Sequence, residues 1–106
     1  NKASMLAIIW RLRGEVELSR PEGNFEKALE YLDNALGYAH AISDVALIQG
    51  ILVDRLGCFL AGERFIEAAA IYPLIKAKVS KLYYVDKQNL DGLLQQYGDT
   101  SNFLLD

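Results

Sequence analysis

The side chains most often used in catalysis are scarce in this sequence. It contains one histidine, His40, and one cysteine, Cys58. His40 falls on the polar side of an amphipathic segment, so we expect it to be exposed to solvent. Cys58 has Asp54 one helical turn before it and no histidine near it in sequence, which favours a buried structural thiol over a nucleophile. One histidine and one cysteine do not make a structural zinc site of the usual kind.

Acidic side chains gather in the first third of the chain: Glu15, Glu17, Glu22, Glu26, Glu30 and Asp33. Glu26 and Glu30 stand one helical turn apart and could hold a metal ion or act as an acid–base pair. A solvated acidic face explains the same spacing and is the favoured interpretation. The sequence has no phosphate-binding glycine loop and no nucleophile elbow. We therefore expect no enzyme activity, no cofactor and no metal site.

One local cluster combines positive charge with aromatic rings. It consists of Lys76, Lys78, Lys81 and Lys87 together with Tyr83 and Tyr84. Such a cluster could contact nucleic acid or an acidic partner. The net charge of −3 gives no overall basic footprint, and lysines are favoured at the C-terminal end of a helix in any case. We expect no nucleic-acid partner.

Length and composition indicate one small folded domain. The chain has 106 residues, of which 52% are hydrophobic and 24% charged, and this excludes disorder. Its lone cysteine fits a reducing compartment, so we expect a cytoplasmic protein. The apolar run 45–48 is far too short to cross a membrane, and no signal peptide is visible. Because the sequence begins with Asn1, we expect it to be a fragment of a longer protein.

The chain is expected to be all-α. Prolines and glycines are sparse, alternating strand patterns are absent, and alanine and leucine are abundant. Capping and breaking residues predict helices over 4–19, from Asn24 to about 42, over 45–61, from Glu63 to about 84 with a kink at Pro73, and over 87–97 after a cap at Asp86.

Each predicted helix has its own apolar pattern. The first carries Met5, Ile8, Ile9, Leu12 and Val16, with Trp10 beside them. The second is the clearest amphipathic segment. The third is apolar on most sides, which is typical of a helix packed between neighbours. The apolar residues of the third helix and the pair Tyr83–Tyr84 also predict some apolar surface left exposed.

Part of the second helix recurs 40 residues later. Phe25, Ala28 and Leu32 have counterparts in Phe65, Ala68 and Tyr72. An arginine–leucine–glycine cluster precedes each set, at 11–14 and at 55–57. Two helix–turn–helix units are the simplest interpretation.

With these residues the chain resembles the tetratricopeptide repeat family over about residues 5 to 80. The matching residues are Trp10, Gly14, Gly23, Phe25, Ala28, Leu32 and Ala35 in the first unit, and Leu56, Gly57, Phe59, Phe65, Ala68 and Tyr72 in the second. The resemblance implies a right-handed superhelix of stacked antiparallel hairpins. Residues 1–106 would form one helical-repeat domain with hairpins at 4–42 and 44–84 and a C-terminal helix at 86–97.

The chain also departs from the family pattern. Neither unit has the closing proline, and Pro73 stands where the family has none. An ordinary antiparallel helical bundle remains the alternative, because alanines recur at helical spacing there too. Family members that clamp chaperone C-termini need a set of lysines and asparagines on their first helices. The corresponding positions here, near Arg11, Glu15, Asp54 and Cys58, do not supply that set.

The resemblance implies a scaffold module that binds another protein or peptide along a groove lined by the first helix of each hairpin. The candidate partner-binding residues are Arg11, Glu15, Gln49 and Asp54. Two alternatives stay open. One is a structural domain that associates with itself through its third and fourth helices. The other is a ligand-sensing domain of a transcriptional regulator.

Overall fold

The computed structural model describes residues 1–98. This part consists of five α-helices and one short 3₁₀ helix, and it contains no strand. The helices are α1 (Lys2–Ser19), α2 (Phe25–Ala41), α3 (Val45–Ala61), α4 (Phe65–Ala77), η1 (Val79–Lys81) and α5 (Tyr84–Gln96). The predicted all-α fold with about five helices is therefore confirmed. The tail over 99–106 lies outside the described residues.

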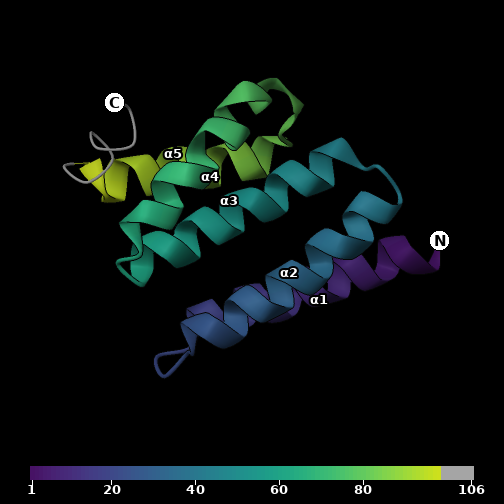
Figure 1. Cartoon of the computed structure of the whole chain (residues 1–106), viewed down its shortest axis with the longest axis horizontal. Coiled ribbons are helices and arrows are strands. Elements are labelled where there is room, and N and C mark those ends of the chain that lie inside the picture. Colours follow the sequence, from purple (N-terminus) through teal and green to yellow (C-terminus); the bar gives the residue numbers. More distant parts are fainter. Residues whose placement is uncertain (99–106) are drawn as a thin grey trace.

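The helices form two antiparallel hairpins and a final helix that returns along the second one (Figure 1). α1 pairs with α2, α3 lies against α2 and pairs with α4, and α5 packs on α3. Because α3 has neighbours on several sides, it buries ten of its residues. The prediction that the third helix is packed between neighbours is confirmed, and α3 exposes little apolar surface itself.

Side chains at the predicted positions start two of the helices. Asn24 accepts a hydrogen bond from the backbone N–H of Lys27, and Asp44 accepts one from the N–H of Leu47. These bonds satisfy N–H groups that have no partner inside the helix. Gly62 ends α3, as its position predicts.

The turns after α2 and after α3 have the same geometry. Ser43 and Glu63 both adopt left-handed backbone conformations, with φ of 53° and 59°. In each turn the residue that follows donates to a carbonyl five residues back, Asp44 to Ala39 and Arg64 to Phe59. The connection between the two hairpins and the turn inside the second hairpin thus share one backbone geometry.

The predicted boundaries of the fourth and fifth helices are wrong. α4 passes through Pro73 and ends at Ala77, whereas the prediction carried the helix to Tyr84. The chain then turns through η1 and lets Leu82 pack against the core, so α5 begins at Tyr84. Asp86 is not a cap: it lies in the first turn of α5 and is buried there.

The recurring alanines occupy equivalent places, but the glycines do not. Ala28 and Ala68 are both fully buried. A Cβ at Gly14 would meet Leu32 of α2, whereas a Cβ at Gly57 would meet Leu93 of α5. The loop after α1 is longer than the loop after α3. An alignment of Gly14 with Gly57 therefore differs by one residue from an alignment of the ends of α1 and α3, Ser19 and Ala61.

The apolar residues of α1 fall on both sides of the helix. Ala7 and Gly14 are buried, and Trp10 is half-buried and packs against the core. Five others keep between 47% and 62% of their surface exposed: Met5, Ile8, Ile9, Leu12 and Val16. The most exposed large apolar side chains on the first hairpin thus belong to one face of α1.

Candidate binding groove

A buried ion cluster joins the first helix of each unit to α5. The Nε of Arg11 donates to a carboxylate oxygen of Asp54 at 2.8 Å, and its Nη2 donates to Asp86 at 2.5 Å. Glu15, one turn along α1, lies 3.7 Å from the same Nε. Arg11 thereby connects α1, α3 and α5 through one side chain.

Burial and charge act against each other in this cluster. Burial raises the pKa of Asp54 to about 7, although Arg11 acts in the opposite direction through its hydrogen bond and charge. Burial alone would lower the pKa of Arg11, but Asp54 and Asp86 outweigh it and hold that pKa above its ordinary value. The cluster therefore keeps its cation and has one carboxyl group that can gain a proton near neutral pH.

Gly50 provides the space in which the cluster forms. A Cβ at this position of α3 would overlap a carboxylate oxygen of Asp86 and would lie 2.8 Å from Nη1 of Arg11. That separation is shorter than real Cβ atoms tolerate. A glycine at this point lets the side chains from α1 and α5 meet across α3.

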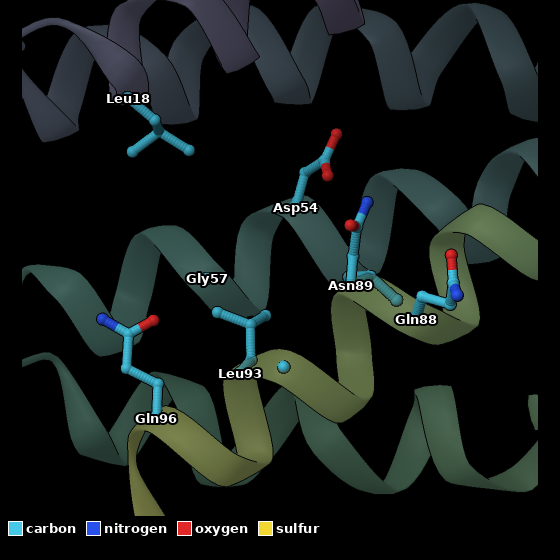
Figure 2. Close-up of a pocket in the computed structure, with 9 residues that line it drawn as sticks. Leu18, Asp54, Gly57, Gln88, Asn89, Leu93 and Gln96 are labelled. Carbon is cyan, nitrogen blue, oxygen red and sulfur yellow. The ribbon is translucent and has the colours of Figure 1, made fainter.

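A pocket of about 380 Å³ opens beside the cluster. Its lining comes from α1, α3 and α5: Leu18, Val53, Asp54, Gly57, Gln88, Asn89, Gly92, Leu93 and Gln96. Figure 2 shows Leu18 and Asp54 extending toward the same space from opposite sides, with Asn89 and Leu93 of α5 at its edge. We call this pocket the groove. It combines leucine side chains, three exposed carboxamides, of which Gln88 also donates to the hydroxyl of Tyr84, and one carboxyl group.

The four candidate partner-binding residues do not all reach this groove. Asp54 lines it, and Glu15 is partly exposed beside the cluster. The side chain of Arg11 is engaged with two carboxylates and is 14% exposed. Gln49 is only 4% exposed, so it lies inside the protein and does not line the groove. The partner-binding role of these residues stays a prediction.

The groove residues on α5 were missed from the sequence. Gln88, Asn89 and Gln96 are exposed carboxamides on a helix whose role was not predicted. Asp86 was interpreted as a cap, so its carboxylate already had a local explanation. The one available signal was its spacing from Leu90 and Leu93, which puts Asp86 on the apolar face of α5, where an acid needs a cation from elsewhere in the chain.

The residues with catalytic potential lie apart. Cys58 is buried, its thiol donates to the carbonyl of Phe25 at 3.5 Å, and burial raises its pKa to about 11. His40 is exposed near the other end of α2, about 22 Å further along that helix at 1.5 Å per residue. The expected exposure of His40 and burial of Cys58 are both confirmed. These two side chains do not form a nucleophile–base pair.

The acidic residues Glu26 and Glu30 and the lysine–tyrosine cluster all lie on the surface. Glu26 pairs with Arg64 of the second hairpin at 2.7 Å, and Glu30 is exposed. Within residues 1–98, no three histidine, cysteine or acidic side chains are placed to hold a metal ion. The predicted lysine–tyrosine cluster around η1 is exposed throughout.

Comparisons with protein-family models, curated proteins and solved structures gave no match. In the described part of the chain, no helix has both the length and the apolar character needed to cross a membrane.

Proposed function

We propose that this chain is a non-catalytic scaffold module that binds a peptide segment of another protein along the groove. The observation that carries this proposal is the composition of the groove lining, which three separate helices supply around Asp54. We expect the module to work in the cytoplasm as part of a larger protein. The hairpins would then stack as the right-handed superhelix that the tetratricopeptide resemblance implies.

The groove side chains suit a peptide with apolar and basic residues. Leu18 and Leu93 offer apolar surface for one side chain of the peptide. The amides of Gln88 and Asn89 each have donors and an acceptor for the peptide backbone. Asp54 would accept a hydrogen bond from a lysine or arginine of the peptide, and ionisation of Asp54 would strengthen that bond.

The test uses peptides selected against the chain from a random displayed library, with affinity measured by calorimetry. Gly92→Leu should weaken binding at least about tenfold, because the added side chain fills the groove. The matched control is Gly37→Leu on α2. A Cβ at either glycine meets nothing within 4 Å, so both variants should fold. Equal affinities for the two variants would contradict the proposal.

A further inference from the structure

A second surface, separate from the groove, lies on the outer face of α1. Its exposed residues are Met5, Ile8, Ile9, Leu12 and Val16, with Arg13 beside them. Four of these six residues, Ile9, Leu12, Arg13 and Val16, border a hollow of about 390 Å³ that Tyr31 of α2 closes on one side. A continuous apolar face of this kind on a helix is typical of a docking surface. We call it the outer face.

The interface between α2 and α3 indicates what would cover it. When the last residues of α1 and α3, Ser19 and Ala61, are aligned, Met5 takes the place of Leu47, and Ile9 takes the place of Ile51. Leu47 and Ile51 are buried in the cluster that α3 shares with α2. The outer face therefore has the residue pattern with which α3 packs on the hairpin before it.

The same alignment extends to the end of the helix and to charge. Val16 takes the place of Cys58, whose thiol contacts the start of α2. Arg13 takes the place of Arg55, which lies 3.2 Å from Asp33 of α2. Within residues 1–98, Arg13 forms no salt bridge and stacks on Trp10 at 4.8 Å instead. The cation of the outer face thus lacks the carboxylate that its counterpart on α3 has.

We propose that the outer face docks a helical hairpin of a partner protein, built like α1–α2. The second helix of that hairpin presents small and apolar residues to Met5, Ile9 and Val16. It also carries an acidic side chain opposite Arg13, as Asp33 stands opposite Arg55. The first helix of the hairpin lies against Ile8 and Leu12, which take the places of Gly50 and Asp54 on α3. This docking is independent of the groove.

The test attaches a surrogate hairpin, because tethering gives even a weak contact a high effective concentration. Residues 1–44 are placed ahead of residues 3–106, so that Ala3 follows Asp44 as Val45 does in the natural order. Met5 is the only methionine of the chain. The added hairpin carries Met5→Leu, so that the remaining methionine reports on the outer face alone, and Arg11→Ala, because Ile8 of the outer face fills the space that Gly50 leaves for Arg11. Its oxidation by peroxide should slow at least about tenfold relative to the unextended chain.

Charge variants test the acidic requirement. In the extended chain, Arg13→Glu on the outer face sets two acids against each other and should restore most of the oxidation rate. Adding Asp33→Lys in the attached hairpin should bring protection back. A purely apolar contact would not respond to this charge reversal. An unchanged oxidation rate in both variants would overturn the proposed pairing of Arg13 with an acidic side chain.

Three further outcomes would also overturn the proposal. The methionine in the extended chain could oxidise as fast as in the unextended one. The added hairpin could fail to increase the helical circular dichroism, which would mean that the outer face does not support its folding. Light scattering could show that the unextended chain is a dimer with protected Met5, which would assign the outer face to a second copy.

Discussion

The guanidinium of Arg11, on α1, donates a 2.5 Å hydrogen bond to the carboxylate of Asp86, on α5. Both side chains are largely buried, and the bond passes over Gly50 of α3. A contact between groups so far apart in the chain can form only when all three helices are in place. The positions of the helices that line the groove therefore depend on the stability of the whole fold.

Removing this cation should destabilise the protein strongly. Arg11→Met leaves Asp54 and Asp86 buried without a counter-charge, and the expected loss is about 3–5 kcal/mol of unfolding free energy. Urea unfolding followed by circular dichroism measures it. Arg20→Met is the matched control, because the side chain of Arg20 is 58% exposed and its loss should matter far less. Similar losses in the two variants would contradict a central role for the cluster.

The stability of the chain should depend on pH through Asp54. An acid whose pKa rises on folding stabilises the folded state most below its unfolded pKa, and this stabilisation is lost as pH rises through the folded pKa. For Asp54 this window runs from near 3.8 to about 7. Unfolding free energy should therefore increase as pH falls from 8 to 5, by at most about 1.4 kcal/mol per pH unit.

Comparison with Asp54→Asn isolates that contribution. Urea titrations at pH 8, 6.5 and 5 should show a slope for the natural chain that the variant lacks. The pKa of Glu17 is lowered, chiefly because its carboxylate accepts a hydrogen bond from the backbone of Asn24. Its effect on stability thus falls below pH 4.5, outside the range from pH 5 to 8 that these titrations cover. If the variant keeps the same slope, another group titrates.

The two glycines Gly50 and Gly37 should respond to alanine in opposite directions. Gly50→Ala forces Arg11 and Asp86 apart, and overpacking of this kind costs about 1–3 kcal/mol. Gly37 is exposed inside α2 with nothing near its Cβ position, so Gly37→Ala should stabilise by about 0.5–1 kcal/mol. Thermal or urea unfolding of both variants checks the pair. A neutral Gly50→Ala would mean that the cluster does not approach α3 this closely.

The thiol of Cys58 should resist modification while the protein is folded. It is 1% exposed, and burial raises its pKa to about 11. At pH 7.5 it should react with a disulfide reagent at least about a hundredfold more slowly than a free thiol, because little thiolate is present. The urea-unfolded chain is the control and should react at the free rate. Rapid reaction of the folded chain would show that Cys58 is accessible.

Local signals predicted the starts of α2 and α3 well, but not the start of α5. Asn24 and Asp44 cap helices through bonds that span three residues, so the sequence alone contains all the participants. The end of α4 was not predictable in this way. The chain leaves the helix after Ala77 because Leu82 packs into a core that distant residues build. Lys78 and Lys81 consequently fall beyond α4 rather than in its last turns.

Periodicity identified which residues share a face but not what that face meets. Met5 and Ile9 follow the same spacing as Leu47 and Ile51, yet the first pair is exposed and the second buried. The difference arises from whether a hairpin precedes each helix in the structure. Periodicity has the same limit at the groove. Arg11 and Asp54 were both named from the sequence, but their contact with each other and the bond from Arg11 to Asp86 are seen only in the folded structure.

The most direct test of the central claim is to map where a selected peptide binds, by amide chemical shifts of the labelled chain. Binding in the groove predicts the largest shifts at Gln88, Asn89 and Leu93 of α5 and at Leu18 of α1, with little change along α2. Shifts concentrated on Met5, Ile9 and Val16, or at η1, with α5 unaffected, would contradict it.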